Sequence, residues 1–489
     1  MSSHDHEQAG GAPPATETFV PRPASAEAPP AWRELLGRDH LGAAIVLAGG
    51  VLAGAINIYL AASLLPTAVA ELGGAGFYAW NMTVYLVAMV IATMLTGRFL
   101  SRWGNAGAYL IGFGTFTAGS LACALSPAMA VLLVSRGVQG LGAGLLSGLG
   151  FAVIRSALPP RLWTRGTALM SAMYGVGNFA GPALGGLFAQ FGSWRLAFAA
   201  MAVIGAGCGV LVPRVLPRIE HRERAGARVP IPVGSLLLLT AAAGAVSVAG
   251  VLPGTLAKVA GIAAAVLLMA GFVAHERRSG LRVFPRTTYR RGSSLKWIYL
   301  TLGLLACGVA AESFLPLFGQ RLAGLPPLAA GFFAAAISLG WSVTQIGSSS
   351  VTAEHAVRRL RVLGPVLLAA GLLVQGLLQR ADTPGWLVLV WVPVLFTAGA
   401  GIGLAYPHLS VAAMSSTRDP EEGGQAAAAI ATVTSLSIAF GTAVAGLLVN
   451  LGGASMLDAA RYALFGLALI CAAGAWTARA ATGAQAPTT

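Results

Sequence analysis

The chain has 489 residues, of which 56% are hydrophobic and only 10% are charged, and its mean hydropathy is +0.75. Soluble domains carry about 25% charged residues, so this composition excludes a soluble fold, which could not cover so much apolar surface. The formal net charge of +14 does not indicate nucleic-acid binding, because the basic residues are scattered over short segments between apolar runs. Anionic lipid headgroups are the expected partners of these charges.

Residues 1–40 come first, contain no apolar core and are expected to be a disordered N-terminus. Fourteen mostly apolar runs follow, and about 20 such residues cross a bilayer as a helix. The runs lie at residues 41–66, 79–97, 107–126, 128–154, 167–190, 195–213, 233–251, 259–274, 297–318, 329–350, 361–379, 386–412, 425–450 and 454–478. The sequence therefore predicts an all-α integral membrane protein with 14 transmembrane helices.

The basic residues predict the orientation in the membrane. Of the 31 Lys and Arg residues, 25 fall on the side of the N-terminus, five on the other side, and Arg136 within a run. Positive charge marks the cytoplasmic side, and an even number of helices returns the chain to it. We therefore expect a multi-pass protein of the cell membrane with both termini in the cytoplasm, including the tail 479–489.

The runs also predict the domain organisation. Two six-helix bundles, 41–213 and 297–478, are separated by 214–296, which contains basic linkers and two extra helices. Two similar bundles around a central path are what alternating access requires, and the extra pair is expected to be peripheral to them. A monomer is expected.

The four cysteines fit neither a metal site nor a disulfide framework. All of them lie within apolar runs, so we interpret them as packing residues. The sequence has no Gly-x-x-x-x-Gly-Lys-Ser/Thr segment and no soluble catalytic domain, so neither an ATP-driven pump nor an enzyme is expected. No metal or cofactor is predicted; a proton gradient would supply the energy.

Glu312 is the carboxylate in the middle of a long apolar run. An acid in hydrocarbon costs at least about 2.5–3.5 kcal/mol, so its presence suggests a task that needs a titratable group. Apolar surroundings favour the neutral form of a carboxyl. The alternatives are a Glu that bonds a neighbouring helix or one that is solvated at the external mouth.

The fourth run places Arg136, Gln139 and Gly140 on one helical face by their i, i+3, i+4 spacing. A guanidinium at this depth must face the protein interior or a wet cavity, unless it reaches the interface along the helix. The glycines four residues apart allow close approach of a neighbouring helix.

The fifth run carries a smooth glycine face, with a proline that bends the helix. Such a helix suits a pivot that must not leak ions, although ordinary small-residue packing would give the same spacing. Between the second and third runs lies a short basic turn. The residues of these two motifs are Gly177, Gly181, Pro182, Gly185 and Gly186 in the helix and Gly97, Arg102 and Gly104 in the turn.

Together and in this order, these segments resemble the major facilitator superfamily, over roughly residues 41–478 and with a layout similar to its fourteen-helix drug/proton antiporter branch. The resemblance implies a proton-coupling motif at Arg136, Gln139 and Gly140, an antiporter motif in the fifth helix and a loop motif after the second. The loop motif departs from the family pattern at Ser101, Asn105 and Ala106. The charge latch that this loop supplies in the family is therefore weakened or replaced.

A second departure concerns the first helix. The branch usually carries an Asp ahead of a Leu-Pro ending, and Asn57 stands at the matching position. An amide can hydrogen-bond a substrate but cannot carry a proton. Proton binding then falls to Glu312 by elimination, with Arg136 adjusting its charge through water or Gln139.

Further polar and aromatic residues are predicted to line the substrate path, although each is individually more typical of packing or of the membrane interface. With Asn57, the candidates are Asn81, Tyr85, Trp341, Gln345 and Tyr406. A largely apolar cavity with a few hydrogen-bonding groups favours lipophilic or cationic organic molecules.

The sequence thus predicts proton-coupled efflux of hydrophobic or cationic organic compounds by alternating access. Two alternatives stay open. One is a dedicated transporter of one endogenous metabolite, lipid or antibiotic. The other is a membrane receptor or scaffold that no longer transports, suggested by Ser101 and Asn57.

Overall fold

The computed structural model describes residues 32–38, 40–159, 162–216, 232–290, 292–416 and 420–483. Most of the N-terminal segment expected to be disordered, most of the first basic linker and the end of the C-terminal tail lie outside these residues. Within the segment 1–40, α1 (Trp32–Leu35) is helical. All regular structure in the described residues is helical, as the sequence predicts for a chain whose backbone must be satisfied in lipid.

The helices form two bundles and an additional pair. The first bundle consists of α2 (Leu41–Leu72), η1 (Ala75–Phe77), α3 (Tyr78–Ala124), α4 (Met129–Ala152), α5 (Ile154–Ala157), α6 (Trp163–Phe191) and α7 (Trp194–Val215). The additional pair is α8 (Val233–Val251) and α9 (Thr255–Arg278), followed by η3 (Arg286–Tyr289). The second bundle consists of α10 (Leu295–Val309), η4 (Ala310–Ser313), α11 (Leu315–Ala323), α12 (Pro327–Ser348), α13 (Glu354–Leu377), α14 (Gly385–Met414), α15 (Pro420–Leu451) and α16 (Met456–Gly483).

Twelve stretches of the described chain are long and apolar enough to cross a membrane. One of them, Ala75–Ala124, contains the second predicted run and nearly all of the third, and α6, which contains the fifth, is not among the twelve. The integral membrane fold is confirmed, whereas the count of fourteen crossings stays a prediction.

The chain reverses direction inside α3, at the predicted loop motif. Gly104 has a φ of +66° and a ψ of −178°, a backbone conformation that glycine adopts without steric cost. Ser126, just after α3, and Glu71, just before it, are both bonded by Arg195. The two ends of α3 therefore lie together, and the motif is helical up to a sharp bend at Gly104.

In both bundles, glycines lie where two paired helices approach most closely. A Cβ added at Gly144 of α4 would lie 2.0 Å from the Met89 carbonyl oxygen of α3, and one at Gly399 of α14 would lie 1.9 Å from that of Ile337 of α12. These glycines let paired backbones approach closely, as the spacing in the fourth run predicts.

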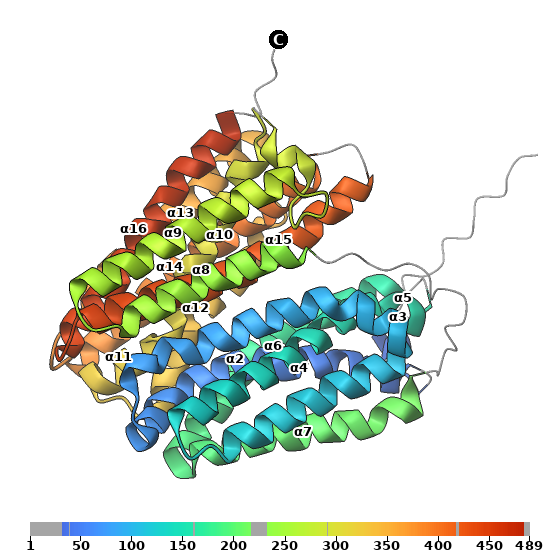
Figure 1. Cartoon of the computed structure of the whole chain (residues 1–489), viewed down its shortest axis with the longest axis horizontal. Helices are drawn as coiled ribbons and strands as arrows, with labels where there is room; N and C mark the ends of the chain where they lie inside the picture. The colour runs from blue at the N-terminus through green and yellow to red at the C-terminus, as the bar shows by residue number, and fades with distance from the viewer. Residues whose placement is uncertain are drawn as a thin grey trace, which may run out of the picture.

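We call the end of the molecule where α2 ends the distal end, and the end where α2 begins the proximal end. Contacts between the bundles gather toward the distal end. There Gly186 of α6 packs against Leu328 of α12, and Gly446 of α15 packs against Ala79 of α3. Figure 1 shows the bundles approaching each other near α11 and diverging toward the end marked by α5.

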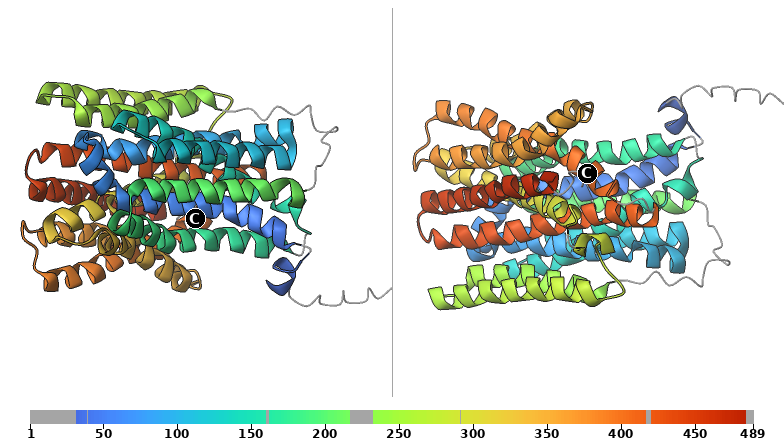
Figure 2. Two further views of the ribbon diagram at one scale, coloured as in Figure 1. Left: turned by 90° about the horizontal axis from the view of Figure 1, so that it is seen from below. Right: turned by 90° about the horizontal axis from the view of Figure 1, so that it is seen from above.

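The additional helices lie at one edge of the molecule, as both views in Figure 2 show. α9 packs mainly on α8, as expected of a peripheral pair, but α8 reaches both bundles. Asn450 of α15 donates to the carbonyls of Gly76 and Gly250, and Trp80 of α3 donates to that of Ser247 in α8. α8 is therefore part of the distal junction between the bundles.

The loop after α9 is anchored by Glu276, a fully buried carboxylate. Glu276 accepts hydrogen bonds from the backbone N–H groups of Val283 and Phe284 and from the hydroxyls of Ser235 and Tyr289. Burial and this nearby carboxylate raise the pKa of Tyr289, so its hydroxyl stays protonated and donates. The loop thereby ties the additional pair to the second bundle, where Phe284 packs on Tyr299 with ring centroids 5.1 Å apart.

Candidate functional site

Glu312 lies where the predicted ninth helix is interrupted. Residues 297–318 were expected to form one continuous span, but α10 ends at Val309 and the single 3₁₀ turn η4 precedes α11. Pro316 explains the break, because it has no N–H to offer the carbonyl of Glu312 four residues earlier. Such a turn inside a helix often marks a functional hinge. Only 7% of Glu312 is exposed.

The Glu312 carboxylate is the end of a hydrogen-bonded chain between the bundles. The Ser338 hydroxyl on α12 donates to its Oε1 at 2.6 Å, and the Tyr59 hydroxyl on α2 lies 3.2 Å from the Ser338 Oγ. Glu312 forms no salt bridge within the described part of the chain. Its described side-chain partner is the Ser338 hydroxyl, which can bond either the charged or the neutral carboxyl.

Arg136 is fully buried inside the first bundle. Its Nη1 donates to the side-chain oxygens of Asn57 and Gln139, and its guanidinium lies 4.1 Å from the centroid of the Tyr85 ring. Gln139 in turn donates to the Ser120 hydroxyl at 2.8 Å. The structure thus joins three of the predicted residues, Arg136, Gln139 and Asn57, in one network.

This network does not reach Glu312 in the described part of the chain. Asn57 and Tyr85 are fully buried in the first bundle, and Tyr85 donates to the Gly54 carbonyl. Both were predicted to line the substrate path, yet their side chains are committed to contacts within the bundle. Among the described residues, no hydrogen bond leads from Arg136 to Glu312, and the described partners of Arg136 all belong to the first bundle.

The antiporter motif on α6 forms a groove for α2. Added Cβ atoms would lie 2.5 Å from the Ala55 Cβ at Gly177, 2.6 Å from the Tyr59 Cβ at Gly181 and 2.5 Å from the Leu60 carbonyl oxygen at Gly185. The α2 backbone therefore rests directly on the glycine face. The turn motif is elsewhere: Gly97 and Arg102 lie on the proximal part of α3, where the Arg102 guanidinium is 5.6 Å from the Trp103 ring centroid.

Three of the predicted substrate-binding residues lie together in the second bundle. The Trp341 Nε1 donates to the Gln345 Oε1 at 2.7 Å, and the Trp341 and Tyr406 rings have centroids 5.5 Å apart. All three side chains are partly exposed. Asn81, in contrast, is buried on α3, and neither polar atom of its side chain has a hydrogen-bond partner among the described residues.

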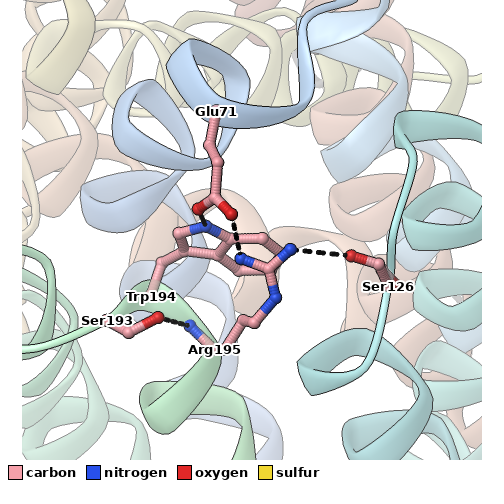
Figure 3. A network of polar contacts seen from close by, with 5 residues as sticks. All are labelled: Glu71, Ser126, Ser193, Trp194 and Arg195. Atoms are coloured by element: carbon pink, nitrogen blue, oxygen red, sulfur yellow. Dashed lines mark hydrogen bonds and ion pairs between the residues drawn. The ribbon is translucent and has the colours of Figure 1, made fainter.

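A further polar network lies at the distal end of the first bundle (Figure 3). Glu71 accepts from the Trp194 Nε1 at 2.6 Å and pairs with Arg195, which also donates to the Ser126 carbonyl at 3.1 Å. This cluster joins the end of α2, the α3–α4 turn and the start of α7. Sequence reasoning did not single it out because Glu71 lies beyond the predicted end of the first helix.

Sequence reasoning also missed Tyr59 as a site residue. The signal was available, since Tyr59 lies two residues after Asn57 in the same helix. A separate groove of about 780 Å³ between α3 and α7, lined by apolar side chains such as Phe113 and Val210, contains none of the predicted residues.

Two helical bundles in a membrane, meeting around a buried carboxylate, define a small-molecule transporter. Residues 47–442 match the family model of the Major Facilitator Superfamily, and the chain belongs to this family. It is accordingly a multi-pass integral membrane transporter rather than an enzyme.

Individual relatives agree with this assignment. The chain is 44% identical over 450 residues to a Mycobacterium tuberculosis protein named probable multidrug-efflux transporter, covering 91% of this chain and 94% of the relative. It is 24% identical to a riboflavin transporter of Clostridioides difficile, over 74% of this chain and 78% of the relative. A peptide transporter structure shares the fold with a TM-score of 0.61 at 20% identity, covering 90% of this chain and 95% of that one.

Proposed function

We propose that the chain exports hydrophobic or cationic organic compounds in exchange for protons, as a member of the fourteen-helix drug/proton antiporter branch. The observation that carries this proposal is Glu312, a buried carboxylate without a salt bridge in the described chain, at a helix break between the bundles. The name of the relative at 44% identity supports efflux of drugs.

In the proposed cycle, Glu312 binds a proton while the site faces outward and releases it to the cytoplasm as substrate binds. The proton thus moves inward down its gradient, and the substrate moves outward. The partly exposed Trp341, Gln345 and Tyr406 supply aromatic faces and an amide for the substrate. The bundles rock about their contacts, with both termini in the cytoplasm.

The test is export of a fluorescent dye from cells expressing wild-type protein or Glu312→Gln at equal membrane levels, with and without an uncoupler. We expect uncoupler-sensitive export in the wild type and at least a roughly tenfold loss in the variant, since the amide cannot exchange a proton. Glu354→Gln is the control, because this carboxylate is 78% exposed at the start of α13.

Full export by Glu312→Gln would remove this residue from the mechanism.

A second candidate function is dedicated transport of one compound, which the riboflavin transporter among the relatives supports. Competition by many unrelated compounds separates polyspecific from dedicated transport. A receptor or scaffold that does not transport would show no substrate-dependent proton flux.

A further inference from the structure

Tyr59 is the side chain through which the first bundle reaches the Glu312 carboxylate. It projects from α2, whereas Ser338 lies on α12, 279 residues later in the chain. Ser338 is fully buried and donates to Glu312 at 2.6 Å. One serine hydroxyl therefore connects the two bundles to the carboxylate.

The hydrogen bonds from Tyr59 through Ser338 to Glu312 all donate in one direction while Glu312 is charged. A serine hydroxyl has one hydrogen to donate and lone pairs with which to accept. While that hydrogen is given to the Glu312 carboxylate, Ser338 can only accept from Tyr59. If Glu312 gains a proton on this oxygen and donates it, Ser338 accepts it and turns its own hydrogen toward Tyr59.

These hydrogen bonds are stronger when Glu312 is charged than when it is protonated. A hydrogen bond to a carboxylate is roughly twice as strong as one between neutral groups, and it polarises the next bond along the chain. The contact between α2 and α12 is therefore tighter when Glu312 is charged than when it is protonated.

The glycine groove on α6 holds Tyr59 in position. An added Cβ at Gly181 would lie 2.6 Å from the Tyr59 Cβ, so the backbone of α2 is seated on α6 at this residue. The hydroxyl of Ser63 also donates to the Tyr59 carbonyl, at 3.1 Å. The α2 backbone at Tyr59 therefore moves with the first bundle and carries the Tyr59 side chain with it.

We propose that Tyr59 and Ser338 are positioning residues that lock the bundles together while Glu312 is charged, and so prevent the empty transporter from returning outward. This inference rests on the proposed proton antiport. An empty, deprotonated transporter that returned outward would carry protons in without exporting substrate. Substrate binding or protonation of Glu312 would release the lock.

Among the described residues, the other ionisable groups on the elements around η4 are bonded elsewhere or lie away from the Glu312 carboxylate. Glu71 of α2 is bonded to Trp194 and Arg195, Arg321 is near the far end of α11, and α12 has no ionisable side chain. The thiols of Cys307 on α10 and Cys471 on α16 bond backbone carbonyls. Tyr78 of α3 donates to the Ser313 carbonyl at 3.2 Å.

The test uses full-length protein in liposomes with an imposed pH gradient, acidic on the side that corresponds to the cell exterior, and no substrate. We expect Tyr59→Phe and Ser338→Ala to raise proton influx about fivefold over wild type, the effect of losing one or two membrane hydrogen bonds. The lumen then corresponds to the cytoplasm. The excess influx of the variants over wild type should fade as the luminal pH is lowered, because protonated Glu312 no longer maintains the lock in the wild type either.

Tyr78→Phe is the matched control. It also removes a buried tyrosine hydroxyl that crosses from the first bundle to η4, but this hydroxyl bonds a backbone carbonyl that does not titrate. Its loss weakens a contact between the bundles regardless of the charge on Glu312, so we expect any rise in substrate-free influx to be independent of luminal pH.

Two outcomes would overturn the inference: wild-type leak in both Tyr59→Phe and Ser338→Ala, or the same pH-dependent leak in Tyr78→Phe. If Glu312→Gln retains coupled export, the proposed antiport fails instead. The two failures are therefore distinguishable.

Discussion

At the scale of single residues, the main contrast is between two buried ionisable groups, Arg136 and Glu312. Arg136 donates to two amide side chains and lies over an aromatic ring, whereas Glu312 accepts from the Ser338 hydroxyl at a helix break and Tyr59 continues that chain. A fixed network stabilises one state, and a chain of hydroxyls accommodates two. We therefore propose that Arg136 serves the integrity of the first bundle and that Glu312 serves the transport cycle.

Asn57 tests this division. Asn57→Leu removes an acceptor from a buried guanidinium, so we expect a loss of about 1–3 kcal/mol in the free energy of unfolding, seen as a lower melting temperature in detergent. Asn57→Asp keeps the acceptor and adds an opposite charge, so it should melt no lower than Asn57→Leu and close to wild type.

Ser135→Ala is the control for this pair. Its buried hydroxyl bonds the Val131 carbonyl in its own helix, so its loss should change the melting temperature little. Equal melting temperatures of Asn57→Leu and wild type would show that the buried Arg136 does not need the acceptor that α2 supplies.

At the scale of helices, α6 carries one glycine that packs against a neighbouring helix and another that has room for a side chain. A Cβ at Gly181 would collide with α2, whereas nothing lies within 4 Å of one at Gly175 on the same helix. Both substitutions change a helical glycine to alanine, so intrinsic helix propensity favours both by about 1 kcal/mol.

We predict opposite outcomes for Gly181→Ala and Gly175→Ala. The first should lower the free energy of unfolding by about 1–3 kcal/mol, because a methyl group is forced into a filled contact. The second should leave stability unchanged or raise it. Melting temperatures of the two variants in one detergent check this, and a tolerated Gly181→Ala would mean that α2 is not seated on the glycine face.

At the scale of the whole molecule, the distal junction determines how the bundles meet. Asn450 donates to Gly76 of the first bundle and to Gly250 of α8, so one amide connects all three parts of the protein. Opening the distal end requires these bonds to break. The additional helix α8 therefore contributes to the stability of the closed distal end.

Replacing Asn450 with Leu should favour the open distal end. Two membrane hydrogen bonds at about 0.6 kcal/mol each amount to roughly 1 kcal/mol, or about a fivefold shift in the equilibrium. The distance between spin labels at the distal ends of α3 and α15 should report a larger open population.

Thr442→Val provides the comparison on the same helix, since this buried hydroxyl bonds the Ile438 carbonyl of α15 itself. Its distance distribution should match wild type. An unchanged distribution in Asn450→Leu would exclude this junction as a determinant of closure.

The positions of the helices followed from the sequence, because an apolar run in lipid has to satisfy its backbone internally and can do so only as a helix or a closed barrel. Each of the fourteen predicted runs overlaps a helix of the structure. The unusual residues in those runs, Glu312 and Arg136, were also evident, since an ionisable group in hydrocarbon stands out by its cost.

Only the tertiary structure decided which of these residues meet. Helical spacing shows that Arg136 and Gln139 share a face, but not that Asn57 of another helix lies opposite them. It gave no sign that Tyr59 would meet Ser338 across 279 residues, or that Pro316 would leave Glu312 in a 3₁₀ turn between the bundles. Periodicity determines a helix and its faces, whereas the neighbour of each face depends on how all the helices pack together.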